Sequence, residues 1–240
     1  MDRLSPQVGA GQGDQVILRR SARATRISLR VSGVDGQVTL TLPLRVAESR
    51  GWDFVRERAD WIAAARARIP QGHVLREGAA LPIEGRPRIV EVVPGRGAVR
   101  LEDDRLIVPG DPARLSVRVV AFLRQLARTR LNTAVDDCCL RLGKMHSGIT
   151  LRDTRSRWGS CTAAGGLMFS WRLVMAPPAV LDYVAAHEVA HLAQMNHSPK
   201  FWAVVARLRP DYQIPRGWLR EHGSGLHAWR FDPDEDPGKE

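Results

Sequence analysis

The sequence predicts an α+β fold in which a small β-rich unit precedes a larger domain of helices and a small sheet. Short runs in which apolar and polar residues alternate fill residues 16–110. A long stretch with helical spacing follows at 111–142, and a second apolar helix begins at Pro177 and Pro178. Alternation with a period of two indicates strands, whereas apolar residues three and four apart indicate helices.

The composition is that of an ordinary globular protein. The chain has 240 residues, 44% of them hydrophobic, which is enough for a core in one large domain or two small ones. No apolar run approaches the roughly 20 residues that span a bilayer, and no apolar segment follows the N-terminus. Three cysteines are too few for a disulfide scaffold. We therefore expect a cytoplasmic protein with no membrane partner.

The net charge is +10, and only three of the 36 basic residues are lysine. A basic surface can hold nucleic acid or acidic partners. GC-rich coding, which replaces lysine by arginine, gives the same bias. The arginines are spread along the chain rather than gathered in one block. The charge therefore allows a nucleic-acid partner without requiring one.

The N-terminal part reads as a flexible tail followed by a compact unit. Residues 1–15 are rich in Gly and Gln and predict the tail. Residues 27–31 and 38–42 alternate on either side of a Gly/Asp turn, which predicts a β-hairpin. Helical spacing over 52–69 predicts one helix. Further short strands continue to residue 110, so we expect the β-rich unit to cover 16–110.

The second domain, expected at 111–230, begins with a long helix. Asp111 is suited to the N-cap, and Gly143 to the residue that ends the helix. Short strands are predicted at 149–151 and 167–174. The helix that begins at the proline pair is expected to run to about Met195, and two shorter helices follow at about 200–208 and 215–221. Residues 231–240 predict an acidic, disordered tail.

The most informative segment is His187-Glu188-Val189-Ala190-His191, an H-E-x-x-H. Residues four apart on a helix are about 40° apart around its axis, so both imidazoles can reach one ion. Glu188 lies about 100° from His187, where it can touch a metal-bound water without being a ligand. The flanking residues are apolar, and burying such polar groups without a partner costs several kcal/mol. The segment therefore predicts a hydrolytic site that holds one Zn²⁺.

A catalytic zinc needs a third protein ligand, and His197 is the best candidate. Six residues beyond His191 it cannot share the same helix face, so the helix must end near Met195 and Asn196 and the chain must turn back. Asn is among the few residues that tolerate a left-handed helix ending. Glu221 and His222 are the alternative third ligands.

Other segments follow this motif in a recognisable order. They are Trp158-Gly159-Ser160-Cys161, Ser170-Trp171-Arg172-Leu173, Asn196-His197-Ser198, Phe201-Trp202 and Pro210-Asp211-Tyr212. With them, the sequence resembles the YgjP-like metallopeptidase family, related to the SprT-like and Wss-type zinc proteases, most strongly over 115–225. The resemblance implies a zincin-like catalytic domain. It also implies that the family's H-E-x-x-H-x5-H falls on His187, Glu188, His191 and His197. Ser170 departs from the pattern, which has Asn there.

The segment Arg157, Trp158, Gly159, Ser160 and Cys161 is a candidate substrate-binding rim. In zincin-type folds the sheet edge beside the zinc helix binds substrate as an added strand. The alternative is structural: Trp158 packs in the core, Gly159 makes a tight turn and Cys161 is a small buried residue.

We expect a zinc endopeptidase acting on protein or peptide substrates, in which Glu188 accepts a proton from the attacking water and passes it to the leaving amine. Two alternatives remain. The Wss-type resemblance implies a nucleic-acid-associated protease acting on DNA-bound or crosslinked proteins. The other alternative is a non-catalytic zinc-binding module. The sequence does not fix the oligomeric state.

Overall fold

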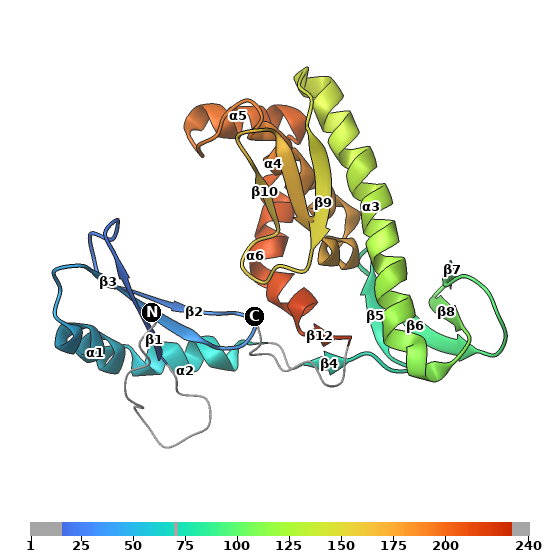
Figure 1. Cartoon of the computed structure of the whole chain (residues 1–240), viewed down its shortest axis with the longest axis horizontal. Coiled ribbons are helices and arrows are strands. Elements are labelled where there is room, and N and C mark those ends of the chain that lie inside the picture. The colour runs from blue at the N-terminus through green and yellow to red at the C-terminus, as the bar shows by residue number, and fades with distance from the viewer. Residues whose placement is uncertain (1–15, 70–71, 232–240) are drawn as a thin grey trace. The chain divides into compact units, whose positions relative to one another are not determined.

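The structure is a computed structural model that describes residues 16–69 and 72–231 (Figure 1). Helices and small sheets occur in both parts of the chain, which confirms the α+β prediction. The chain divides into two compact units between residues 71 and 72. The sequence predicted the boundary between residues 110 and 111, so this prediction differs from the structure.

The first unit contains a three-stranded sheet. Its strands are β1 (Val16–Ser21), β2 (Ser28–Val31) and β3 (Val38–Pro43), in the order β1-β3-β2. β2 and β3 are antiparallel and form the predicted hairpin, whereas β1 runs parallel to β3. The alternation along β3 buries every second side chain, as expected for a sheet with one covered face.

Two helices follow this sheet where the sequence predicted one. They are α1 (Glu48–Glu57) and α2 (Ala59–Ala67). Arg58 leaves the helical region, with φ −106° and ψ 14°, and its carbonyl accepts the first hydrogen bond of α2 from Ile62. The core of the unit consists of Val38, Leu40, Leu42, Val55 and Ile62.

The second unit begins with a strand, β4 (His73–Val74), and a four-stranded sheet. The strands of that sheet are β5 (Ala80–Ile83), β6 (Arg86–Val93), β7 (Arg100–Glu102) and β8 (Arg105–Pro109), in the order β5-β6-β8-β7. β6 and β8 are parallel, and the two outer pairs are antiparallel.

This sheet explains the position of the domain boundary. Leu81, Leu106 and Val108 are almost wholly buried and belong to the same apolar core as Val119 and Leu123 of the long helix. The strands expected to complete the N-terminal unit therefore pack into the second one. Their alternating pattern predicts strands correctly, but says nothing about which core the apolar face joins.

The long helix is α3 (Leu115–Leu142), preceded by one 3₁₀ turn, η1 (Pro112–Arg114). The carboxylate of Asp111 accepts a hydrogen bond of 2.9 Å from the Ala113 amide, as an N-cap should. Gly143 ends the helix in the left-handed conformation with φ 68°, which L side chains disfavour. The predicted end at Gly143 is confirmed, whereas Asp111 caps the 3₁₀ turn and α3 itself begins at Leu115.

A second three-stranded sheet follows α3. It contains β9 (Gly148–Arg152), β10 (Gly159–Cys161) and β11 (Gly166–Ser170), in the order β10-β11-β9. β11 is parallel to β9 and antiparallel to β10. The predicted strand at 167–174 is too long, because Trp171–Met175 forms a 3₁₀ segment, η2, and all five of its residues are buried.

Three helices and a short strand complete the second unit. These are α4 (Pro178–Ala190), α5 (Pro199–Leu208), α6 (Gln213–His227) and β12 (Trp229–Arg230), which pairs with β4. Helix α4 packs against α3, α5, α6 and β10, so it lies at the centre of the domain. None of the described helices combines the length and apolar character needed to cross a bilayer.

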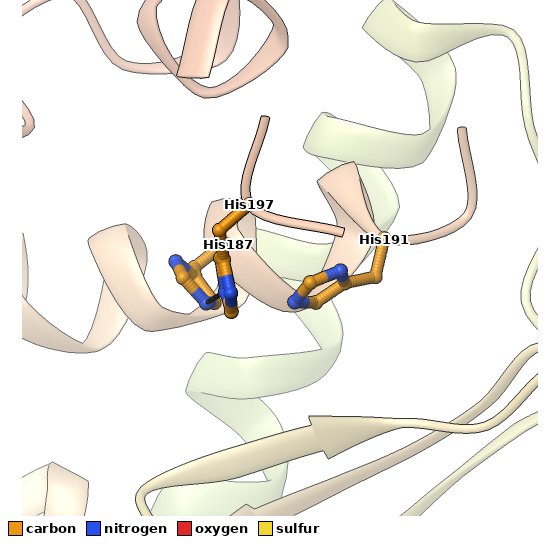
Figure 2. A group of neighbouring side chains, drawn as sticks. All are labelled: His187, His191 and His197. Atoms are coloured by element: carbon orange, nitrogen blue, oxygen red, sulfur yellow. Dashed lines mark hydrogen bonds between the residues drawn. The ribbon is translucent and has the colours of Figure 1, made fainter. Parts of the chain in front are cut away.

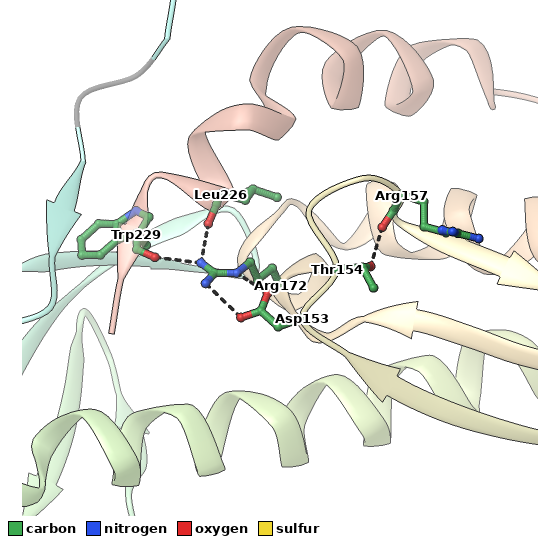
Figure 3. Close-up of polar contacts among 6 residues, drawn as sticks. All are labelled: Asp153, Thr154, Arg157, Arg172, Leu226 and Trp229. Atoms are coloured by element: carbon green, nitrogen blue, oxygen red, sulfur yellow. Dashed lines mark hydrogen bonds and ion pairs between the residues drawn. The ribbon is translucent and has the colours of Figure 1, made fainter. Parts of the chain in front are cut away.

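A buried arginine ties the end of α6 to the sheet (Figure 3). Arg172 donates to the two carboxylate oxygens of Asp153 at 2.7 and 3.0 Å. Its Nη1 also donates to the carbonyls of Leu226 and Trp229 at 3.0 and 2.8 Å. The side chain is only 7% exposed, so the ion pair and carbonyls replace the water that the guanidinium loses.

The predicted tails at 1–15 and 232–240 lie outside the described residues. Phe231, which the sequence assigned to the C-terminal tail, is buried. Its ring packs edge-on against Trp171 at 5.3 Å between centroids. Phe231 therefore belongs to the second unit.

Candidate active site

Three histidines converge beside α4 (Figure 2). His187 lies on the helix, His191 is its C-cap and His197 comes from the segment that leads to α5. One ring nitrogen of each can be chosen so that all three lie within 4.8 Å of one another. The Nε2 atoms of His187 and His197 are 3.1 Å apart. Among the described residues this is the one such group of potential metal ligands.

Helix α4 ends earlier than predicted, at Ala190 rather than near Met195. His191 keeps helical angles, with φ −64° and ψ −23°, so it still shares a face with His187. Turn hydrogen bonds then carry the chain around, from the Ala193 and Gln194 amides to the Ala190 carbonyl. The predicted left-handed residue at Asn196 is wrong, because in the described chain only Glu84 and Asp103 have positive φ among non-glycine residues.

The start of α5 fixes where this turn finishes. Ser198 is the N-cap, and its hydroxyl accepts a hydrogen bond from the Phe201 amide. His197 therefore lies directly before a capped helix, which brings its ring back to His187 as the sequence analysis required.

The imidazoles of His187 and His191 are in the neutral form that binds metal. Nδ1 of His191 is 3.1 Å from the carbonyl oxygen of Gln194, which can only accept, so Nδ1 donates and the Nε2 lone pair stays available. Burial lowers the pKa of His191. Burial, followed by the other two imidazoles and Arg216, lowers the pKa of His187 to about 3. Both rings are neutral at pH 7, as ligation requires.

The donor set fits a zinc ion. Nitrogen ligands about 2.0–2.1 Å from a tetrahedral zinc lie roughly 3.4 Å from each other. The 3.1 Å separation of the His187 and His197 nitrogens is close to that value, and His191 completes the set within 4.8 Å. Nδ1 of His187 is buried without a hydrogen-bond partner in the described residues, so the orientation of that ring depends on packing.

Phe201 is the floor of this site. Its ring centroid lies 4.9 Å from that of His187, 4.5 Å from His191 and 4.7 Å from His197. The side chain is wholly buried. Trp202 forms a wall and stacks on His197 at 27° and 5.9 Å. Sequence reasoning did not identify Phe201 as a contact of all three imidazoles, because its place depends on the turn between α4 and α5.

Glu188 lies on the buried side of α4, next to the sheet. It is only 5% exposed, and burial raises the pKa of its carboxyl to about 7 against the opposing charge of Arg157. The backbone of Gly159 passes so close that a Cβ there would stand 2.6 Å from both Cγ and Oε1 of Glu188. The carboxyl group is thus held between α4 and β10.

The segment 157–161 faces two places. Gly159 lies against Glu188, and burial followed by the Glu188 charge raises the pKa of the Cys161 thiol. Ser160 lines a cavity of about 600 Å³ together with Arg157 and with Met168, its partner on β11. Within β10, the difference between Ser160 and its two neighbours follows from the alternation of side chains along a strand.

Trp158 contacts a residue outside the group of His187, His191 and His197. It stacks on His227 at 4.6 Å and 27°, and Gly223 of α6 lies against its ring. Burial lowers the pKa of His227 to about 4, so this ring is neutral at pH 7. Glu221 and His222 are not members of the histidine group, and His222 packs instead against Trp218 at 5.1 Å.

The chain was compared with curated proteins, solved structures and family models. No curated protein matches the chain. A solved structure, "the metallopeptidase zymogen of Pyrococcus abyssi abylysin", has 17% identity and a TM-score of 0.34, covering 38% of this chain and 93% of its own. The family model described as "YgjP-like, metallopeptidase domain" matches residues 25–222. The chain, which carries a group of three histidines able to hold a metal ion, therefore belongs to the YgjP-like family and is a metallopeptidase.

Proposed function

We propose that this metallopeptidase is a zinc endopeptidase in which His187, His191 and His197 hold the ion. The observation that carries the proposal is the convergence of three imidazoles beside a buried carboxyl group, that of Glu188. Three nitrogen donors without an oxygen ligand suit zinc better than magnesium or calcium. When bound, the ion supplies positive charge that polarises the substrate carbonyl and acidifies water.

Glu188 moves the proton. Its carboxyl group would accept a proton from the attacking water and release it in the next step, and burial, which raises its pKa to about 7 in the metal-free protein, favours this exchange. The proton then goes to the amine that leaves, which makes the cleaved bond a peptide bond. A structural metal site has no use for a buried carboxyl group that is not a ligand, so Glu188 argues against the non-catalytic alternative.

The substrate is proposed to bind along β10. This strand is at the edge of its sheet, in the order β10-β11-β9, and packs on α4 beside Glu188. An extended peptide can add to such an edge through main-chain hydrogen bonds. Gly159 and Cys161 would then lie next to the peptide, since both belong to β10 and the backbone of Gly159 lies against Glu188.

The test is metal content measured beside peptide cleavage on four proteins. The wild type is expected to hold about one zinc and to cleave a casein or mixed-peptide substrate. Glu188→Gln should keep the zinc and lose cleavage, and His197→Ala should lose the zinc. His222→Ala is the matched control, which should retain both. Cleavage that survives Glu188→Gln, or zinc that survives His197→Ala, would contradict the proposal.

A further inference from the structure

A cation lies beside the histidine site on a side that the mechanism above does not use. Arg216 is in the first turn of α6, and its Cζ lies 4.5 Å from the ring centroid of Trp202. The same Trp202 ring stacks on His197 and lies 5.8 Å from His187. One indole therefore connects the guanidinium to two of the three imidazoles.

Neither the helix dipole nor an ion pair among the described residues stabilises the charge of Arg216 at its position. A positive charge in the first turn of a helix opposes the helix dipole, which favours acidic residues at that end. Helix α6 has no acidic residue in its first turn. Across residues 16–69 and 72–231, the exposed guanidinium stacks on Trp202 and forms no ion pair. Its charge is therefore available to a ligand.

The contacts of Trp202 place Arg216 next to the histidine group. Besides His197 and His187, the indole contacts Phe201 edge-on at 5.2 Å between ring centroids. Arg216 is thus separated from the proposed metal ligands by a single aromatic side chain.

We propose that Arg216, supported by Trp202, binds a carboxylate of the substrate, so that the enzyme prefers peptides with Asp or Glu close to the cleaved bond. A guanidinium binds a carboxylate through two parallel hydrogen bonds, and an aromatic ring below it limits its motion. Arg216 is then a specificity-determining residue. This inference rests on the proposed peptidase function and names the substrate class of that site.

The experiment uses pairs of peptides that differ only by Glu or Gln, placed in turn at each of the three positions on either side of the cleaved bond. At one or more positions the wild type should cleave the Glu peptide with a kcat/KM about tenfold higher. Arg216→Gln should bring that ratio close to one, and Arg216→Lys should keep part of it. The matched control is Arg207→Gln, which removes an exposed charge from α5 and should leave the ratio unchanged.

A binding measurement separates failure of this inference from failure of the peptidase proposal. Labelled Glu and Gln peptides are titrated into Glu188→Gln and into the double variant with Arg216→Gln. Glu188→Gln should bind the Glu peptide more tightly than the Gln peptide. The double variant should bind the two peptides equally. Two results would overturn the carboxylate site even if cleavage depends on Glu188. One is equal affinity of Glu188→Gln for the Glu and Gln peptides, and the other is a preference for the Glu peptide that persists after Arg216→Gln. A wild type that cleaves nothing overturns the peptidase proposal, and the binding comparison still decides the carboxylate site.

Discussion

The backbone of Gly159 lies directly against the carboxyl group of Glu188, and no side chain fits between them. The glycine is needed for this approach rather than for an unusual φ, since it is not among the residues with positive φ. The contact joins β10 to α4 at the one carboxyl group that the mechanism uses. It therefore gives the Trp158-Gly159-Ser160-Cys161 motif a role in positioning Glu188.

Gly159→Ala should displace Glu188 and reduce kcat/KM by about 100-fold or more, because small misplacements of a catalytic group are costly. The zinc content should stay at the wild-type level, since the histidines are not touched. Gly225→Ala is the control, because a Cβ there meets no atom within 4 Å. That variant should be active, and as stable as the wild type or more so by up to about 1 kcal/mol. Wild-type activity in Gly159→Ala would show that Glu188 does not depend on this contact.

The metal-free protein should lose stability as the pH rises through the titration of Glu188. The folded pKa is about 7, raised from an ordinary 4.5, so the folded state holds this proton more tightly than the unfolded chain. The contribution is present in full below pH 4.5 and is lost as the pH approaches 7 and above. Glu188→Gln removes this dependence.

The stability difference is the free energy of unfolding of Glu188→Gln minus that of the wild type. Between pH 4.5 and pH 8 this difference should rise by about 3 kcal/mol in favour of Glu188→Gln. Urea titrations with a chelator present at both pH values measure this difference. His187 acts in the opposite direction, because its pKa falls from 6.5 to about 3 and its contribution is lost as the pH drops through that window. Comparison of the two proteins cancels it. An equal difference at both pH values would contradict the burial of Glu188.

Asp153→Ala should lower the free energy of unfolding by about 3 kcal/mol, because it leaves the Arg172 guanidinium buried without its carboxylate. The midpoint of urea unfolding measures this loss. Glu102→Ala, which breaks an ion pair with Arg100 whose two side chains are half exposed, should change stability by no more than about 0.5 kcal/mol. Equal losses in the two variants would mean that Arg172 is solvated in solution.

Zinc should raise the thermal midpoint of the wild type, since a ligand that binds only the folded state stabilises it by about 4 kcal/mol at a thousandfold excess over Kd. His197→Ala should show little of this shift, and a chelator should reverse it in the wild type. His222→Ala should respond like the wild type, because His222 packs on Trp218 outside the histidine group. A full zinc response in His197→Ala would exclude that residue as a ligand.

Local features of this molecule could be predicted from sequence, because a few neighbouring residues determine them. The spacing of His187 and His191 placed both on one helix face. Asp111 marked the 3₁₀ turn that leads into α3, and Gly143 marked the end of that helix. The turn after α4 was predicted, but not the residue at which the helix ends, because the turn uses main-chain bonds among residues 189–194 that have no distinctive composition.

Features that depend on contacts between distant segments could not be predicted from the sequence. Nothing near Gly159 indicates that its backbone meets Glu188, and nothing near Trp158 indicates its stacking on His227. The strands at 80–109 were predicted as strands, but their shared core with α3 depends on the whole fold. A nucleic-acid partner stays a prediction, which DNA binding measured against salt concentration tests.

The side chains of β10 alternate, with Gly159 and Cys161 facing Glu188 and Ser160 facing away. The connection to β11, with Gly165 at φ 79°, sets which residue of β10 pairs with which residue of its neighbour. Deleting or inserting one residue in that connection would turn Ser160 toward Glu188 and Gly159 away from it. Substitutions in the connection should therefore be tolerated far better than changes in its length. The length of this loop, more than its composition, therefore keeps Gly159 against Glu188.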